Sequence, residues 1–399
     1  MYFQTKDKSE CCACTACVSS CPKSCIRMVK DEEGFAYPVI DEVNCISCHL
    51  CERVCPVEHP NYSNAKTPET YAVLLKDVEE RKKSSSGGAF YAIASFVLKK
   101  CGIVIGSTMD ENLQVRHIAI ESLDELYKLR GSKYVQSDLG DVFSKIRQAL
   151  KDNRWCYFVG TGCQVAGLKS FLGKDYPTLI TSDLVCHGVP SQKLFDQHIS
   201  YLEEKYHDRV INYQFRNNSS WGGCEIVDFE THKTVKNPSY ELSPYLYSFM
   251  YAMTYRHSCY ECRFAQVPRQ GDITLADFWG VDEFFAQVDT KHGVSLVLVN
   301  TEQGKMAWEQ SKCSFEYYQS TLIDGAKYNG NLVKKSEKPS VRDSIYKQIE
   351  EKGYGTIAKT VFSSPNTFKI KMYNAINNSY IAQHFLSLYR MIKKISQKI

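Results

Sequence analysis

The chain has 399 residues, of which 43% are hydrophobic and 24% are charged, and its formal net charge is +4. This composition is that of a globular protein with two or three domains, and it excludes an intrinsically disordered chain. The small net charge argues against a nucleic-acid partner, and no run of about 18 apolar residues predicts a membrane-spanning helix. We find no signal peptide and therefore expect a cytoplasmic protein.

Cysteines dominate the first 55 residues, which contain ten of the 18 in the chain. One run with the spacing Cys-x2-Cys-x2-Cys-x3-Cys-Pro ends at Pro22, and a second ends at Pro56, 34 residues later. This doubled pattern is typical of bacterial ferredoxins that bind two 4Fe–4S clusters. Thiolates are required there because iron in a sulfide cluster prefers soft, anionic ligands.

In this motif the fourth cysteine of each run binds the cluster of the other run. We therefore assign one cluster to Cys11, Cys14, Cys17 and Cys55, and the second to Cys45, Cys48, Cys51 and Cys21. A pair of zinc sites is the alternative, but two four-cysteine runs that both end in Cys-Pro are a poor zinc pattern. Cys12 and Cys25 lie outside the spacing and are interpreted as small apolar side chains.

The elements expected in chain order begin with two short strands between the cysteine runs, at Ile26–Val29 and Phe35–Ile40. A polar linker at 58–70 follows. Strands and helices then alternate: strands are expected at 70–75, 103–106, 155–159 and 178–184, and helices at 89–100, 123–127, 139–151 and 164–172. This alternation predicts an α/β domain with a mixed or parallel sheet.

Two glycine-containing turns are candidate cofactor sites. The first precedes a helix, so its backbone N–H groups and hydroxyls suit a phosphate; it comprises Ser84, Ser85, Ser86, Gly87 and Gly88. The second, Gly160–Cys163, lies between a strand and a helix, but its glycine spacing does not match the dinucleotide-binding fingerprint. The alternative for both is a tight loop that binds nothing.

Five ordered segments resemble the coenzyme F-420 hydrogenase/dehydrogenase beta-subunit family. They are SSGGAF at 85–90, GSKY at 131–134, GTGCQ at 160–164, DLVCHGVPS at 183–191 and GDITLADFWG at 271–280. The resemblance covers about residues 70 to 285 and implies a flavoprotein with FAD and 4Fe–4S clusters; an N-terminal two-cluster ferredoxin is a known arrangement among its members. The chain departs from the family pattern at Gly162, where proline is common, and at Ala276, where glycine is common, which weakens the residue-level flavin assignment.

The resemblance also implies where these groups bind. We expect FAD at the Ser84–Gly88 loop and at Ser132, Lys133, Tyr134, Thr161, Gly162 and Gln164. A third cluster is expected on Cys163, Cys186, Cys259 and Cys262, with Cys224 as a reserve ligand; the alternative is buried thiols. Lys133 and His187 are the candidate catalytic residues, the first as a positive charge near the flavin or its phosphates and the second as a proton shuttle. The alternatives are a solvated surface lysine and an ordinary loop histidine.

The predicted architecture is therefore an N-terminal two-cluster ferredoxin-like module (residues 1–62) fused to a flavin-binding α/β domain with a mixed sheet. That domain is divided into an N-terminal part (68–150) and a part with the third cluster (151–325), and a helical basic tail (326–399) follows. The predicted function is an oxidoreductase that passes electrons between ferredoxin-type clusters and FAD, with ferredoxin or another redox protein as partner and a small molecule as substrate. Three hypotheses stay open: a reductase of a sugar or polysaccharide precursor, a deazaflavin-linked oxidoreductase, and an electron-transfer subunit without its own substrate.

Residues 353–399 contain seven Lys or Arg and no Asp or Glu. Apolar residues recur there at helical spacing, at Phe385, Leu388, Met391, Ile392 and Ile395. The pattern predicts a basic amphipathic helix, which either packs on its own domain or makes a peripheral contact with the inner face of a membrane.

Overall fold

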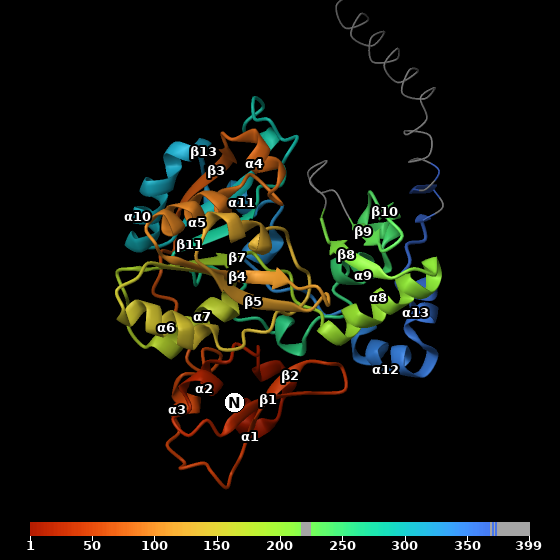
Figure 1. The fold of residues 1–399 in the computed structure, drawn as a ribbon, viewed down its shortest axis with the longest axis horizontal. Helices are drawn as coiled ribbons and strands as arrows, with labels where there is room; N and C mark the ends of the chain where they lie inside the picture. Colours follow the sequence, from red (N-terminus) through yellow and green to blue (C-terminus); the bar gives the residue numbers. More distant parts are fainter. Residues whose placement is uncertain (217–224, 368, 371, 373–399) are drawn as a thin grey trace, which may run out of the picture.

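The computed structural model describes residues 1–372 except 217–224, 368 and 371. It has three parts: an N-terminal module, a central domain built on an eight-stranded sheet, and a smaller subdomain beside it (Figure 1). Cys224 and the helix predicted at 381–399 lie outside the described residues. Within the described part of the chain, no helix is long and apolar enough to cross a membrane.

The N-terminal module repeats one small unit twice. Helices α2 (Ala16–Ser20) and α3 (Leu50–Arg53) each lie within a cysteine run, and the antiparallel strands β1 (Ile26–Lys30) and β2 (Ala36–Ile40) lie between the runs. Thr15 and His49, which are 34 residues apart, both have a positive φ, of 60° and 57°, immediately before these helices. The 34-residue sequence repeat is thus a repeat of backbone conformation, and the ferredoxin-like layout and both predicted strands are present. A further short helix, α1 (Tyr2–Thr5), precedes the first run.

The central sheet is mixed, as the alternation of elements indicates. Its strand order is β13 (Phe315–Ser320), β3 (Glu69–Leu75), β12 (Ser295–Val299), β11 (Ile273–Asp277), β7 (Leu179–Leu184), β6 (Cys156–Thr161), β4 (Ile103–Met109) and β5 (Val115–Ile120). Neighbours from β11 to β4 are parallel, and the outer pairings are antiparallel. Strands from both sides of residue 150 therefore share one sheet, and β5 is a strand that the sequence pattern did not indicate.

Helices cover both faces of this sheet (Figure 1). On one face α5 (Ala89–Lys99) and α10 (Glu302–Ser311) bury side chains such as Ile93 and Trp308. On the other, α6 (Val142–Lys151) and α7 (Gly162–Leu172) pack through Phe143 and Leu168. Two short helices, α4 (Val78–Lys82) and α11 (Leu322–Ala326), lie near β3. The helix expected near 123–127 is a 3-10 helix over Leu123–Leu129.

The smaller subdomain has its own core. It contains α8 (Gln192–Tyr206), the antiparallel strands β8 (Val210–Gln214), β9 (Ile226–Phe229) and β10 (Thr234–Lys236), and the helices α9 (Pro244–Met250), α12 (Arg342–Lys352) and α13 (Tyr354–Thr360). Aromatic side chains fill this core, among them Phe195, Tyr213 and Tyr245. The described part of the segment from residue 326 thus packs into a folded unit through α12 and α13.

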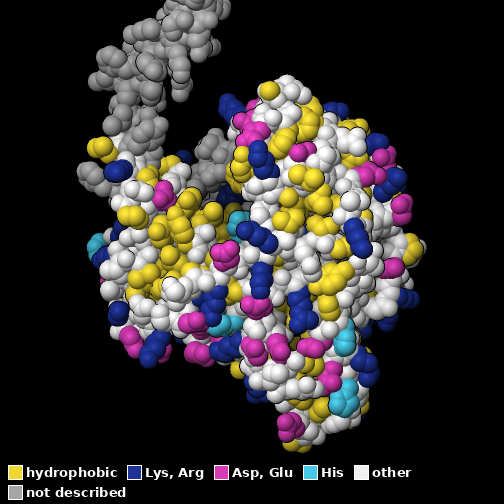
Figure 2. All heavy atoms as spheres, turned by 180° about the vertical axis from the view of Figure 1, so that it is seen from behind, with side chains coloured by type: hydrophobic (Ala, Val, Ile, Leu, Met, Phe, Trp, Pro, Cys, Tyr) yellow, Lys and Arg dark blue, Asp and Glu magenta, His cyan; other side chains and the backbone are white. Residues whose placement is uncertain are grey.

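Buried contacts hold the N-terminal module against the rest of the molecule. Gly167 on α7 lies so close to the first cysteine run that a Cβ there would be 2.6 Å from Cys14 Cβ, so only glycine permits this approach. The guanidinium of Arg256, a residue 1% exposed, donates to the carbonyls of Cys11 (2.6 Å) and Ala36 (3.0 Å). The module is therefore an integral part of the structure in spite of projecting from it (Figure 2).

Candidate functional site: a cavity bordered by cysteines

A cavity of about 740 Å³ lies at the carboxyl ends of the parallel strands. Its wall includes Ser107 near the end of β4, Thr161 at the end of β6, Leu184 at the end of β7 and Asp277 at the end of β11. Ligands of open α/β sheets characteristically bind at this edge, because the loops that follow the strands diverge there. The volume is within the usual range for a small-molecule or cofactor site.

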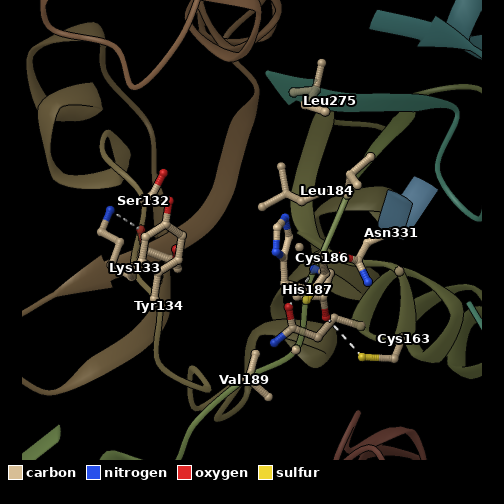
Figure 3. A pocket seen from close by; sticks show the side chains of 18 of the residues that line it. Ser132, Lys133, Tyr134, Cys163, Leu184, Cys186, His187, Val189, Leu275 and Asn331 are labelled. Carbon is tan, nitrogen blue, oxygen red and sulfur yellow. Dashed lines mark hydrogen bonds between the residues drawn. The ribbon is translucent and has the colours of Figure 1, made fainter. Parts of the chain in front are cut away.

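The structure gathers nearly all of the sequence-predicted flavin residues around this cavity. Those in the wall are Ser84, Ser85, Ser86, Gly88, Ser132, Lys133, Tyr134, Thr161, Gly162 and Gln164. In Figure 3 the segment Ser132–Tyr134 faces Leu184, Cys186 and His187 across the open space. Gly87 is the exception, because it is not in the wall. A Cβ on it would lie 2.1 Å from the carbonyl oxygen of Val73, so this glycine lets the loop pass close to β3.

Hydrogen bonds define the shape of the serine loop before α5. Ser84 Oγ donates to the carbonyl of Glu80 (3.1 Å), and Ser86 Oγ donates to the carbonyl of Val294 (2.9 Å). Ser85 Oγ accepts from the backbone N–H of Ser132 (3.0 Å), which joins the two predicted flavin segments. The loop is thus anchored beside the N-terminus of an eleven-residue helix, where backbone N–H groups favour an anion.

Lys133 is the basic group inside the cavity. Its Nζ donates to the carbonyls of Arg130 (2.7 Å) and Ser107 (2.9 Å), which hold the ammonium in place. Burial lowers the pKa of Lys133 to about 7, because few water molecules reach the charge. The alternative interpretation of this residue as a solvated surface lysine is therefore wrong.

The structure brings together the four cysteines proposed for a third cluster. Cys163 lies in the first turn of α7, Cys186 follows β7, and Cys259 and Cys262 are on one short loop; all four line the cavity. Burial, and then the neighbouring Cys186 and Cys262, raise the pKa of the Cys259 thiol. Burial, and then Cys163 and Cys262, raise the pKa of Cys186 to about 12. Several thiolates this close together repel one another, so the set suits a positively charged iron–sulfur core.

The ferredoxin cysteines also fall into two spatial sets. Burial, and then the neighbouring Cys11 and Cys55, raise the pKa of the Cys17 thiol, and Cys14 is a buried member of the same set. The last cysteine of the second run thus joins three cysteines of the first, as the motif requires. In the other set Cys48 is exposed.

Two cysteines outside the ladder lie against these sets. Cys25 Sγ is 3.4 Å from Cys21 Sγ. Cys12 is hydrogen-bonded to Cys163, and this bond, followed by burial, raises the pKa of the Cys163 thiol. No group of three or more His, Cys, Asp or Glu side chains in the described ranges converges closely enough to hold one metal ion. A 4Fe–4S cluster differs from a single ion in binding each ligand through a different iron atom.

One apolar cluster connects the first ferredoxin set with the cavity. Val57, Ala166 and Phe264 are buried at its centre, and four cysteines pack against them: Cys12, Cys55, Cys163 and Cys262. Cys55 belongs to the first ferredoxin set, whereas Cys163 and Cys262 belong to the cavity set. The two sets are therefore near neighbours, with no water-filled gap required between them.

His187 follows Cys186 on the cavity wall. Its ring is stacked with Phe249 at a centroid distance of 6.2 Å, and its backbone carbonyl accepts from Ser336 Oγ at 2.5 Å. The residue is accessible through the open cavity, yet the surrounding protein atoms partly desolvate the ring and lower its pKa. A neutral imidazole at pH 7 is thus available next to the cysteine set.

Sequence reasoning missed several cavity residues. His117 and Ser137 line the wall, but they belong to no recognised motif, and β5, which carries His117, was not predicted. Arg216 also lines it and donates to Asp277 at 2.6 Å. Asp277 is within the segment 271–280 that resembles the family, so its polarity was the one available signal.

The fold and the cysteine sets define an oxidoreductase of the iron–sulfur class. The chain belongs to the coenzyme F420 hydrogenase/dehydrogenase beta-subunit family. Residues 153–318 match the family model for the C-terminal part of the beta subunit of coenzyme F420 hydrogenase/dehydrogenase, and residues 10–59 match the 4Fe-4S dicluster domain. The dicluster match confirms the ferredoxin prediction for the N-terminal module.

Two individual proteins are similar to parts of the chain. An uncharacterized ferredoxin from Methanocaldococcus jannaschii is 31% identical over 80 residues, which are 20% of this chain and 86% of that protein. Among solved structures, a chain of the F420-reducing NiFe hydrogenase complex from Methanosarcina barkeri is 18% identical with a TM-score of 0.46. That match covers 72% of this chain and 92% of the hydrogenase chain.

Proposed function

We propose that this protein is an FAD-dependent iron–sulfur oxidoreductase that moves electrons between a redox protein bound at its ferredoxin module and an organic substrate in the cavity. The observation that carries the proposal is the series of three cysteine sets leading from the exposed Cys48 to the cavity wall at Cys186. A series of this kind is required if an electron is to cross the protein in short steps.

The outer end of the series is open to a partner. Val43 and Ile46, which flank the start of the second cysteine run, are 93% and 57% exposed, and Cys48 in the same run is exposed. The module projects from the body of the molecule (Figure 2), so a protein can approach this loop without obstruction. Exposed apolar side chains on a projecting loop suit a transient protein contact.

The inner end of the series is a site suited to a flavin. Bound 4Fe–4S clusters exchange single electrons and a bound flavin exchanges electron pairs, so together they connect one-electron donors with two-electron substrates. The serine loop and the N-terminus of α5 would hold the pyrophosphate, and the ammonium of Lys133 would attract an anionic part of the cofactor. His187, neutral and accessible, would exchange a proton with the substrate.

The cavity favours a protein with its own substrate. Sugar or polysaccharide precursors and a deazaflavin are the two substrate classes proposed, and both need a cavity beside the flavin. An electron-transfer protein without its own substrate is the second candidate function. Its support is the family description, which names a beta subunit and so points to a partner protein.

The test is the cofactor content of protein purified without air. Iron, sulfide and flavin are quantified together, and we expect roughly twelve irons and one FAD per chain, since each cluster contains about four irons. Roughly eight irons with FAD would remove the third cluster from the proposal. A colourless protein that binds zinc would overturn the proposed function.

A matched pair of variants locates the third cluster. Cys163→Ser is expected to lose about four irons, because serine is a poorer ligand for iron than a thiolate. Cys12→Ser is the control, since Cys12 is hydrogen-bonded to Cys163 but lies outside the proposed ligand set. Equal iron loss from both variants would contradict the ligand assignment.

A further inference from the structure

A line of hydrogen bonds crosses the cavity wall from β5 to the start of α7. His117 Nε2 lies 3.1 Å from the carbonyl oxygen of Val159, and His117 Nδ1 lies 2.8 Å from Ser137 Oγ. Gln164 Nε2 donates to the same Ser137 Oγ at 3.1 Å. The backbone N–H of Thr161 donates to Gln164 Oε1 at 2.9 Å. The side chains of His117, Ser137 and Gln164 all line the cavity.

The chemistry of the groups assigns a direction to each bond. A carbonyl oxygen only accepts, so His117 Nε2 carries the hydrogen that points to Val159. The ring is buried, which lowers the pKa of His117 to about 4, so at pH 7 it is neutral and Nδ1 is an acceptor. The hydroxyl of Ser137 must therefore donate to His117, and its oxygen is left to accept from Gln164.

The same logic assigns the orientation of the Gln164 amide. Its oxygen faces the Thr161 N–H, and its nitrogen faces Ser137, so neither end can exchange with the other without losing a bond. An amide nitrogen has two hydrogens, and Ser137 takes one of them. The cavity wall at Gln164 is therefore a hydrogen-bond donor.

We propose that His117 is a positioning residue that acts through Ser137 to hold the Gln164 amide as a donor toward the redox-active ring of the bound flavin. The inference rests on the proposed function and adds two residues, His117 and Ser137, that neither the motifs nor the relatives assign. The ring is the recognised part because Gln164 directly follows Cys163, whose Sγ lies 3.0 Å from Thr161 Oγ1. Electron exchange requires the ring to be near this cysteine set, whereas the anchored serine loop suits the phosphates.

Two variants break the line at successive positions. His117→Phe keeps an aromatic ring next to Phe158, with which His117 is stacked at 5.5 Å, but loses both nitrogens. Ser137→Ala removes one oxygen only, and it keeps the test valid if His117→Phe does not fold. Ser122→Ala is the control, because Ser122 is exposed and absent from the cavity wall.

The measurements are the dissociation constant for FAD and the flavin midpoint potential. Each single variant is expected to bind FAD roughly threefold to tenfold more weakly, the effect of about one neutral hydrogen bond. The midpoint potential should fall, because a donor stabilises the electron-rich reduced ring; a tenfold change in that equilibrium is about 30 mV for two electrons. The double variant should resemble a single one, because both changes interrupt the same line.

The outcomes separate this inference from the proposed function. Wild-type protein that binds no flavin would overturn the proposed function itself. Flavin-binding variants with the wild-type dissociation constant and potential would overturn the role of His117. Weaker binding at an unchanged potential would also overturn it, because the donor would then face another part of the cofactor.

Discussion

Replacing Glu33 by Gln tests how the ferredoxin module is attached to the rest of the protein. Glu33 lies in the turn between β1 and β2, and its carboxylate accepts two hydrogen bonds from Arg342, at 2.9 Å and 2.5 Å. Arg342 begins α12, a helix of the smaller subdomain, and its side chain is fully buried. His257 lies 3.7 Å from the same carboxylate. The pair therefore joins two distant parts of the chain.

The magnitude follows from the pKa of the carboxyl group. Burial alone would raise the pKa of Glu33, but His257 and Arg342 outweigh it and lower the pKa from 4.5 to about 2. At about 1.36 kcal/mol per pKa unit, the folded state gains about 3 kcal/mol from the ionised form. Because the folded pKa is depressed, this contribution is complete above pH 4.5 and is lost as the pH falls from 4.5 to 2.

The assay is anaerobic denaturant unfolding of the wild type and Glu33→Gln between about pH 7 and pH 3.5. At pH 7 the variant should lose about 3 kcal/mol of unfolding free energy or more, because Arg342 is left buried without a counter-charge. The difference between the two proteins should shrink below about pH 4.5. The control is Glu32→Gln, whose side chain is 72% exposed and pairs with Lys8, so a loss under about 1 kcal/mol is expected. Equal losses for both variants, or a difference independent of pH, would refute the reasoning.

Three further changes have defined outcomes. The ammonium of Lys133 is lost as the pH rises through about 7, so FAD titrations from about pH 6 to pH 8 should show weakening affinity, and Lys133→Met should bind weakly and show no such dependence. Gly167→Leu should lower the iron content and thermal stability together, because its side chain overlaps Cys14; an iron content equal to wild type would contradict the close packing. Arg256→Met leaves the carbonyl of Cys11 without its donor and should destabilise the protein by roughly 1–3 kcal/mol in denaturant unfolding, and unchanged stability would argue against this contact.

Much of the outline was available from local patterns. The doubled cysteine spacing identified the ferredoxin module because the ligands of each run are set by residue spacing within one short loop. Strands such as β3, β6 and β7 were found because a strand buried on both faces is a continuous apolar segment. Strand β5 was missed because His117 and Arg116 interrupt its apolar pattern.

The amino-acid sequence by itself therefore determined the iron–sulfur ladder, the α/β class and the family. Only the tertiary structure decided that Cys163, Cys186, Cys259 and Cys262 line one cavity, since three different segments supply them. The same is true of Glu33 and Arg342, which are 309 residues apart, and of the line from His117 to Gln164. Periodicity and spacing report on neighbours within a few turns of chain, whereas these contacts depend on strand order and on how the separate parts pack.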